Sequence, residues 1–464
     1  MYREQHIHFV GIGGIGMSGL AQVLLSLGYS VSGSDLRSTG TTKQLATKGA
    51  VIYSGHSAEN VQDADVVVMS SAIREDNPEL VAARERGIPI IPRAELLGEL
   101  MRFKKFGIAV AGAHGKTSTT SMVAAVLDQG GKDPTVIIGG KVNGIGTNAY
   151  WGKGQFLVAE ADESDGSFLR LTPSIVVITN IDREHLDYYS GLHDIEDAFY
   201  RFMEKTPFYG VTIACGDDEI LMRVLSRSNK RRFIYGTGPD CELRARNIRS
   251  EGLLSKFDVE FRGGLLGSIE LHVPGIHHVR NALAAVAVGL ELEVPFKDIS
   301  RGLCSYSGVG RRFDILGTEK GITVVDDYAH HPTEIRATLA AARNAWPDRR
   351  LMVLFEPHRY SRTQMLMEEF STAFTAAEEL WISEIYPASE PAIVGVSGER
   401  LARLIRETTG QKVHFVKDVS VLPQAVAPAL RPGDIVMTLG AGAIGRIGNM
   451  LLSDIKGKHA AAAI

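Results

Sequence analysis

Short runs of β-branched residues alternate with segments of helical periodicity along most of the chain. Near the N-terminus the apolar run HIHFV (6–10) comes first, followed by apolar residues at helical spacing between residues 17 and 27, and then by the strand-like run YSVSGSD (29–35). This β-α-β order is typical of a parallel sheet covered by helices. The pattern predicts an α/β protein.

The alternation falls into three blocks, and a chain of 464 residues is too long for one ordinary core. The basic stretch MRFKKF (101–106) ends the first block, and the third begins after the motif GRRFD. We therefore expect an N-terminal Rossmann-like domain at residues 1–104, a central domain with a P-loop ATPase-like parallel sheet at 105–312, and a C-terminal Rossmann-like domain at 313–464.

Between residues 230 and 274 the period changes to two, as in KFDVEF and SIELHV, with glycine turns between the runs. Alternation of this kind predicts antiparallel strands. We expect these strands as an insertion late in the central domain. The last residues, KGKHAAAAI (456–464), have the composition of a frayed tail.

Charge and composition narrow the classes of function. A formal net charge of −4 gives no basic field to attract a polyanion, so nucleic acid is not an expected partner. A strand-like run begins at residue 6, which leaves no room for a signal peptide, and no apolar run reaches membrane length. Cys215, Cys241 and Cys304 lie too far apart for a disulfide framework or a close metal cluster. We expect a cytoplasmic protein without a membrane partner.

The stretch AGAHGKTSTT (111–120) follows an apolar strand and precedes a helical run. Backbone amides around Gly112, His114 and Gly115 can form a nest for phosphate at the helix N-terminus. Lys116 would neutralise the β- and γ-phosphates of a nucleotide, and the Thr117 hydroxyl would bind Mg²⁺. Val110 stands where the standard motif has its first glycine, and the alternative is a glycine-rich turn with a surface lysine.

A nucleotide loop needs a metal-binding acid at the end of a neighbouring strand, and FLVAEADESD supplies Glu160, Asp162, Glu163 and Asp165 there. We assign the metal to Glu160; solvated acids at a strand end are the alternative. The next strand runs into TNIDREHLDYY, and His185 lies just past its end, where ligands gather in such sheets. A lone histidine is more often structural than a metal ligand.

The N-terminal motif GIGGIG places Gly11, Gly13 and Gly16 at dinucleotide-binding spacing, and Asp35 follows Gly16 by 19 residues. This pattern requires a diphosphate at a helix N-terminus, and the UDP group satisfies it as well as NAD does. An NAD-dependent oxidoreductase is therefore an alternative function, although it would leave the lysine loop unused.

Two motifs of the third block, VVDDYAHHPTE and LFEPHRYSRT, place charged groups and imidazoles directly after apolar strands. Arg359 and Arg362 offer planar donors suited to carboxylate or phosphate. The alternative is that they pair with nearby acids such as Glu369 on a solvated helix face.

With these residues in place, the chain resembles the Mur ligases. The resemblance covers essentially the whole chain and rests on GIGGIGMSGLA, AGAHGKTSTT, EADESDGSF, NIDREHLDYY, HHVRNALAA, GRRFD, DDYAHHPTE and PHRYSRT in the family's order. It implies ATP-dependent ligation of L-alanine to the carboxylate of UDP-N-acetylmuramate through an acyl phosphate, in peptidoglycan precursor synthesis. A sister ligase that attaches a preformed peptide is the closest alternative, and the opening motif favours the alanine-adding branch. A binding module that hydrolyses ATP as a switch would leave PHRYSRT unexplained.

The resemblance also implies roles for individual residues, and it suggests that the outer domains close over the central one. The catalytic residues would be Lys116, Glu160, His185 and Arg312. Two Mg²⁺ ions, or Mn²⁺, would be held by Thr117, Glu160 and His185. ATP would contact Gly112, Ala113, His114, Gly115, Lys116, Thr117, Ser118, Asn281, Arg312 and Asp327, with Asn281 at the adenine. The UDP-sugar and alanine would contact Gly11, Gly13, Gly14, Gly16, Asp35, Ser70, Ser71, Ser164, His331, His358, Arg359 and Arg362.

Three residues depart from the family's usual pattern. Ala113 stands in place of threonine, His278 in place of asparagine and Glu356 in place of glutamine. None of them removes a group assigned to catalysis, and Glu356 is expected to add negative charge beside the substrate arginines. The resemblance does not specify the oligomeric state or the strictness for alanine.

Overall fold

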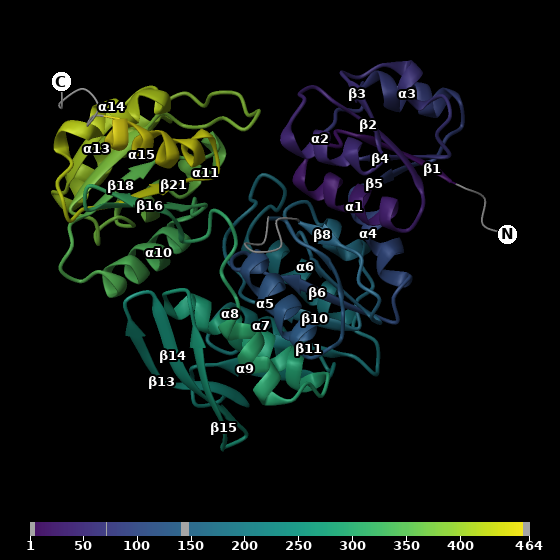
Figure 1. Ribbon diagram of the computed structural model, residues 1–464, viewed down its shortest axis with the longest axis horizontal. Coiled ribbons are helices and arrows are strands. Elements are labelled where there is room, and N and C mark those ends of the chain that lie inside the picture. Colours follow the sequence, from purple (N-terminus) through teal and green to yellow (C-terminus); the bar gives the residue numbers. More distant parts are fainter. Residues whose placement is uncertain (1–4, 71, 141–147, 458–464) are drawn as a thin grey trace.

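The structure is a computed structural model that describes residues 5–70, 72–140 and 148–457. It has three lobes, each built around its own sheet, and the first and third lobes lie at opposite ends of the middle one (Figure 1). The predicted substrate residue Ser71 lies outside the described residues. None of the helices in the described ranges is both long enough and apolar enough to cross a membrane.

The N-terminal sheet is parallel and five-stranded, in the order β3-β2-β1-β4-β5. Its strands are β1 (His6–Val10), β2 (Ser30–Asp35), β3 (Val51–Ser54), β4 (Val66–Met69) and β5 (Ile90–Pro92). Its helices are α1 (Ile15–Ser26), α2 (Gly40–Thr47), α3 (Pro78–Glu85) and α4 (Arg93–Arg102). Because the strand order reverses on either side of β1, the glycine loop between β1 and α1 opens at the switch point where such sheets bind ligands.

The central sheet has ten strands in the order β15-β14-β13-β12-β11-β10-β6-β9-β7-β8. Its first seven strands are β6 (Phe106–Ala111), β7 (Thr135–Ile137), β8 (Ala149–Tyr150), β9 (Phe156–Glu160), β10 (Ile175–Ile178), β11 (Val211–Cys215) and β12 (Arg232–Gly236). Its helices are α5 (Lys116–Gln129), α6 (Leu192–Glu204), α7 (Glu219–Leu225), α8 (Ile276–Glu291) and α9 (Phe296–Cys304). Since β6 pairs in parallel with both β9 and β10, the three loops at their carboxyl ends meet at one edge.

The expected antiparallel strands are present as β13 (Leu243–Glu251), β14 (Leu254–Phe261) and β15 (Gly264–Leu271). They extend the central sheet directly, because β13 begins as a parallel neighbour of β12 and only then forms the antiparallel meander. Figure 1 shows this meander projecting from the central lobe, below the C-terminal one.

The C-terminal sheet has six strands in the order β16-β17-β21-β18-β19-β20, and β16 is its antiparallel edge. The strands are β16 (Asp314–Glu319), β17 (Ile322–Asp327), β18 (Leu351–Phe355), β19 (Glu379–Ser383), β20 (Lys412–Val416) and β21 (Ile435–Leu439). The helices are α10 (Pro332–Ala345), α11 (Tyr360–Met365), α12 (Met367–Ser371), α13 (Gly398–Thr409), α14 (Leu422–Val426) and α15 (Ile447–Gly457). The first two residues of the predicted tail, Lys456 and Gly457, form the end of α15. Residues 458–464 lie outside the described residues.

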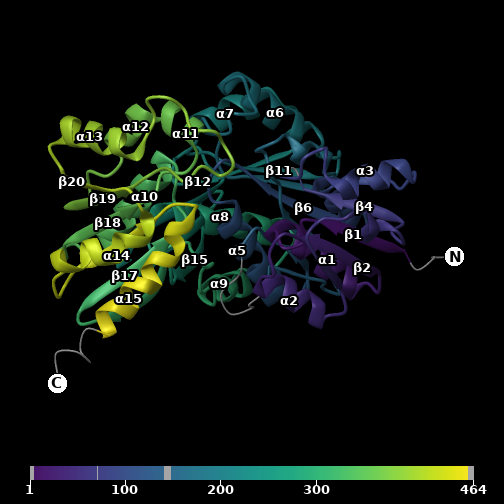
Figure 2. The same cartoon turned by 90° about the horizontal axis from the view of Figure 1, so that it is seen from above.

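The two outer lobes are joined to the central one in different ways. Apolar residues of the first and central lobes form one continuous core, and Asn148 donates to the Ile15 carbonyl at 2.6 Å across their boundary. The C-terminal sheet has separate apolar clusters on its two faces. Its link to the central lobe passes through Arg311 and Phe313, whose φ angles of +62° and +48° are left-handed. The view in Figure 2 shows the C-terminal lobe standing beside the central sheet as a distinct body.

A single aromatic side chain anchors the acidic loop that follows β9. Phe168 is fully buried, with its ring 4.6 Å from that of Phe202 and 5.4 Å from that of Phe199, and its amide donates to the Asp162 carbonyl at 3.0 Å. The apolar ring therefore fixes the chain that carries the predicted metal-binding acids.

We expect Phe168→Ala to lower the free energy of unfolding by about 3–5 kcal/mol, because it leaves a cavity in a close-packed cluster. Phe208→Ala is the matched control, since that ring is 94% exposed and its loss should cost less than about 0.5 kcal/mol. Urea unfolding of both variants measures the difference. Equal losses would show that the Phe168 cluster does not stabilise the fold.

Candidate active site

The loop between β6 and α5 has the conformation that a phosphate-binding loop needs. Gly112 and Gly115 have φ angles of +133° and +83°. A Cβ atom on Gly112 would lie 2.1 Å from Thr179 Oγ1, and one on Gly115 would lie 2.8 Å from Asn281 Oδ1. Both glycines are thus required by backbone angle and by close approach to β10 and α8.

Lys116, at the first turn of α5, is folded back over this loop. Its Nζ donates to the Gly112 carbonyl at 2.6 Å and to Glu163 Oε1 at 2.7 Å. Burial alone would lower the pKa of Lys116, but the negative charge of Glu163 raises it above the ordinary value. The lysine is therefore a fixed cation beside the amide nest.

Two carboxylates lie beside the lysine, Glu163 buried and Glu160 half-buried. Glu160 Oε1 accepts from the Gly139 amide at 2.8 Å and the Thr117 hydroxyl bonds to the same carboxylate, whose pKa is raised by burial. Glu163 Oε1 also lies 3.3 Å from His185 Nε2, while its Oε2 is buried and has no hydrogen-bond partner among the described residues. Carboxylate, hydroxyl and imidazole donors with an orphaned oxygen suit Mg²⁺ or Mn²⁺.

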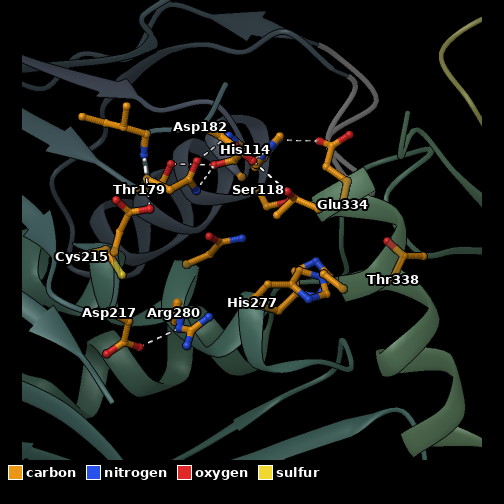
Figure 3. A pocket seen from close by; sticks show the side chains of 18 of the residues that line it. His114, Ser118, Thr179, Asp182, Cys215, Asp217, His277, Arg280, Glu334 and Thr338 are labelled. Atoms are coloured by element: carbon orange, nitrogen blue, oxygen red, sulfur yellow. Dashed lines mark hydrogen bonds and ion pairs between the residues drawn. The ribbon is translucent and has the colours of Figure 1, made fainter. Parts of the chain in front are cut away.

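A cavity of about 400 Å³ opens beside this loop, between the central and C-terminal lobes (Figure 3). Among the residues expected to contact ATP, it is lined by His114, Gly115, Ser118, Asn281, Arg312 and Asp327. The part of the wall formed by Cys215, Ile220 and Tyr235 is largely apolar. A charged end near the loop and an apolar end suit a nucleotide.

Two cavity residues have special environments. Asp327 accepts from the amides of Phe313 at 2.7 Å and Ala329 at 2.8 Å, and burial raises its pKa to about 6. Asp327 thus holds the interdomain link as well as lining the cavity. Burial lowers the pKa of His278 to about 4, so this ring is neutral, and its Nδ1 bonds to the Pro274 carbonyl at 2.7 Å.

His114 joins the central and C-terminal lobes at the mouth of the cavity. Its Nε2 lies 2.9 Å from Asp182 Oδ2 and its Nδ1 lies 3.4 Å from Glu334 Oε1, as Figure 3 shows. Burial opposes the charged form, yet the hydrogen bond to Asp182 and the charge of Glu334 raise the pKa of His114 to about 10. His114, Asp182 and His331 offer metal-ligand atoms within 4.8 Å of one another, but a His114 ring protonated on both nitrogens has no lone pair to give a metal.

The substrate arginines of the C-terminal lobe face acids of the central lobe. Arg362 is buried, and its Nη2 lies 3.1 Å from Glu184 Oε1. Arg359 Nη1 lies 2.6 Å from Asp187 Oδ2. Glu369, the acid considered as an alternative partner of these arginines, has its Oε1 3.9 Å from Arg183 Nη1 instead. The arginines are therefore held at the domain interface rather than on a solvated helix face.

Three further predicted residues lie in the C-terminal and central lobes. His358 stacks on Tyr386 with ring centroids 5.5 Å apart, and burial lowers its pKa to about 3. His331 caps α10, accepting from the Thr333 amide at 3.3 Å. Ser164 lies in the turn after β9, where its amide donates to Asp162 at 3.1 Å.

The glycine loop of the N-terminal lobe forms a tight turn. Gly11 has a φ angle of +80°, the Gly13 amide donates to Asp35 Oδ2 at 2.9 Å, and Gly14 precedes the first turn of α1. A Cβ atom on Gly16 would lie 3.0 Å from Arg93 Nη1. Ser70 follows β4, and its hydroxyl accepts from the Ala72 amide at 3.2 Å.

Glu356 is held by a loop of the C-terminal lobe. Its Oε2 accepts from the Ile444 amide at 2.9 Å, and the carboxylate serves the loop that follows β21. Burial raises the pKa of this group, and Arg311 is the cation that offsets its charge. The carboxylate is therefore engaged by the loop after β21, and its effect on the predicted substrate arginines stays a prediction. Ala113 takes part in the loop through its backbone, donating to the Asn180 carbonyl at 3.3 Å.

Several residues of the site carried no assignment from the sequence. They are Arg93, which pairs with Asp162 at 3.0 Å between the first two lobes, and the acids Glu163, Asp182, Glu184 and Glu334. All except Arg93 lie inside motifs named in the sequence analysis, so their place in a motif was the signal that could have identified them. The partners lie on distant segments, which sequence spacing does not reveal.

A lysine-bearing glycine loop, adjacent buried acids, a nucleotide-sized cavity and an arginine-bearing third domain define a nucleotide-dependent enzyme with a separate platform for a second substrate. Comparison with family models gives three successive matches: "Mur ligase family, catalytic domain" over residues 6–105, "Mur ligase middle domain" over 110–289 and "Mur ligase, glutamate ligase domain" over 311–442. The chain belongs to the Mur ligase family.

Individual relatives are similar over their full length. The UDP-N-acetylmuramate–L-alanine ligase of Geobacter sulfurreducens is 55% identical over 97% of this chain and 98% of its own. That of Desulfotalea psychrophila is 56% identical with the same coverage. Among solved structures, the UDP-N-acetylmuramate-alanine ligase of Thermotoga maritima has a TM-score of 0.83 at 31% identity, covering 98% of this chain and 99% of its own. A murein peptide ligase of Psychrobacter arcticus shares the fold, with a TM-score of 0.71 at 24% identity over 97% and 98% of the two chains.

The raised pKa of His114 predicts a loss of stability in alkali. Because its folded-state pKa of about 10 lies above the ordinary 6.5, protonated His114 adds to the free energy of unfolding. This contribution is complete below pH 6.5 and disappears as the pH rises through 10. We expect the wild-type melting temperature to fall more steeply than that of His114→Gln between pH 7.5 and about 10.5. Thermal unfolding across this range measures both slopes, and parallel slopes would rule out a protonated His114.

Proposed function

We propose that this chain joins L-alanine to the carboxylate of UDP-N-acetylmuramate, with conversion of ATP to ADP and phosphate, in the synthesis of peptidoglycan precursors. The observation that carries the proposal is full-length identity of 52–56% to curated ligases with this activity. An oxidoreductase would make no use of Lys116 or the cavity beside it. We also propose that the enzyme acts in the cytoplasm.

The reaction needs two steps, because a carboxylate oxygen is not a leaving group in water. A carboxylate oxygen of the muramoyl group attacks the γ-phosphorus of ATP, ADP leaves, and an acyl phosphate forms. The alanine amine then attacks the acyl carbon, phosphate leaves with the oxygen, and the nitrogen loses a proton. No side-chain nucleophile is required.

The first step brings two anions together, so the site has to supply positive charge. Lys116 is held beside the loop by Glu163, and Arg312 lines the nucleotide cavity with its Nη1 3.4 Å from Glu334. Fixed cations in a site that excludes water stabilise charge more strongly than mobile ones in solvent. We assign to these two residues the neutralisation of the phosphates.

Divalent metal would add to that neutralisation by binding phosphate oxygens. We assign Thr117 and Glu160 to one ion and His185 to a second, with Mg²⁺ as the expected ion and Mn²⁺ as a substitute. Support comes from the oxygen and imidazole donors gathered there and from the unpartnered Glu163 Oε2 beside His185. Glu163 is an additional ligand candidate in this assignment.

The other substrates are assigned to the outer domains, at residues 1–104 and 313–464. The amides of the N-terminal glycine loop would hold the UDP diphosphate, and His358, Arg359 and Arg362 would meet the muramoyl carboxylate and alanine. A sister ligase that attaches a preformed peptide remains the alternative. The murein peptide ligase of known structure is less similar to this chain than the curated alanine ligases are, which favours alanine as the acceptor.

The order of the two steps can be tested by trapping. Hydroxylamine added to enzyme with ATP and UDP-N-acetylmuramate, without alanine, should intercept the acyl phosphate as a hydroxamate. Lys116→Ala should reduce hydroxamate formation by about 10²–10³-fold, because it removes a fixed charge that stabilises phosphoryl transfer. Arg362→Ala should still form hydroxamate while peptide product falls. Colorimetric detection of the iron–hydroxamate complex gives the rate of hydroxamate formation for both variants.

Absence of hydroxamate from the wild-type enzyme has two explanations that isotope transfer separates. Oxygen-18 in the substrate carboxylate appears in released phosphate if an acyl phosphate forms but is shielded from the trap. If the label stays out of phosphate, the acyl phosphate mechanism is wrong.

The assignment of the glycine loop predicts a selective effect on the UDP-sugar. A Cβ atom on Gly13 would lie 2.7 Å from Asp35 Oδ2, so Gly13→Val should displace the loop. We expect the KM for UDP-N-acetylmuramate to rise by at least about tenfold, while that for ATP stays within about twofold. Gly40→Ala is the control, since its Cβ would meet no atom within 4 Å. Tight NAD binding without UDP-sugar binding in calorimetry would reverse the assignment.

A further inference from the structure

One buried carboxylate stands between the C-terminal lobe and the phosphate side of the site. Glu184 lies in the segment between β10 and α6, and it is 6% exposed. Its Oε1 faces the C-terminal lobe, at 3.1 Å from Arg362 Nη2 and 3.4 Å from His330 Nε2. Its Oε2 faces the central lobe, at 3.8 Å from His185 Nε2 and 3.9 Å from His114 Nδ1. The two oxygens thus contact groups of two different domains.

The contact with Glu184 fixes the orientation of Arg362. Arg362 Nη1 donates to the His358 carbonyl at 3.2 Å and lies 3.1 Å from His358 Nδ1, while Nη2 is bound by Glu184. Both terminal nitrogens of the guanidinium are therefore engaged. Since α11 is a short helix and Arg362 is buried, the side chain depends on these partners for its direction.

The position of Glu184 in the chain ties this contact to the phosphate side. The next residue is His185, whose left-handed φ of +56° turns the backbone sharply at this point. His185 lies 3.3 Å from Glu163, which holds Lys116. One turn of the chain therefore carries both the partner of the substrate arginine and a group beside the loop lysine.

We propose that Glu184 is a positioning residue that orients Arg362 for the amine step when the C-terminal domain docks. This role rests on the proposed function, with Arg362 orienting the carboxylate of L-alanine. Removing the charge of Glu184 leaves Arg362 in place but unaligned. Acyl phosphate formation depends on Lys116 and Arg312, neither of which forms an ion pair with Glu184 among the described residues. The charge of Glu184 acts on Lys116 only through space, and more weakly than that of Glu163.

Glu184→Gln tests this role, because it keeps the shape of the side chain and removes its charge. We expect the KM for L-alanine to rise by at least about tenfold, while kcat falls by less than about threefold. Hydroxamate formation from ATP and UDP-N-acetylmuramate without alanine should stay within about threefold of wild type. Glu184→Asp keeps the charge at a shorter reach, and it should restore part of the loss in alanine affinity.

Glu369→Gln is the matched control. It also removes a carboxylate that faces a cation across the same two domains, Arg183 at 3.9 Å, but it does not touch Arg362. Its KM for alanine should stay within about twofold of wild type. A similar rise in both variants would overturn the proposal, because general docking would then explain the effect.

Two other results would also overturn the role of Glu184. A lower melting temperature with an unchanged KM for alanine would make Glu184 a purely structural residue. Loss of hydroxamate in Glu184→Gln would place its action in the first step. Failure of the proposed function is distinguishable, since the wild-type enzyme itself would then form neither hydroxamate nor ligated product.

Discussion

The closed arrangement of the site depends on an ionic interface between the central and C-terminal domains. Asp182, Glu184 and Asp187 lie within six residues of one central segment, and each faces a group of the C-terminal lobe. The nucleotide cavity exists only because this interface brings Arg312, Asp327 and Glu334 opposite the phosphate loop. Without it, the central domain would keep its lysine and acids but lose one wall of the site.

The two boundaries of the central lobe differ in their chemistry. The first and central lobes share an apolar core, and separating them would expose that surface to water at a large cost. The C-terminal lobe has its own core and is held by ion pairs, whose partners regain solvation when they separate. Left-handed backbone at Arg311 and Phe313 turns the chain sharply in the connection between the two lobes. The first and central lobes are thus joined mainly by apolar packing, whereas charged contacts join the third lobe to the central one.

The sequence predicted the architecture well because each βα unit has its own local pattern of apolar residues. Period-two and period-3.6 runs marked the strands and helices, and the glycine loops appeared at the switch points of their sheets. The same local patterns could not show that β13 continues the central sheet from β12, because which strands pair is decided by the tertiary structure.

Within the site, the sequence located groups but not their partners. It placed Lys116, Glu160 and His185 near one sheet edge, yet it could not distinguish the setting of Glu160, which meets Thr117 and Gly139, from that of Glu163, which meets Lys116 and His185. Glu356 shows the same limit from the opposite side. Its neighbours in sequence include His358 and Arg359, which are predicted to bind substrate. Its side chain instead accepts a hydrogen bond from the amide of Ile444, 88 residues away.

Exchange of partners is a general requirement of such a site. In the structure Lys116 pairs with Glu163, Arg312 with Glu334, Arg362 with Glu184 and Arg359 with Asp187. Each cation is therefore oriented before it meets an anion, which reduces the ordering cost of binding. The family's reaction brings a carboxylate to a triphosphate, and this pre-paired set of acids and bases lets the protein keep four buried or half-buried cations in place without that substrate.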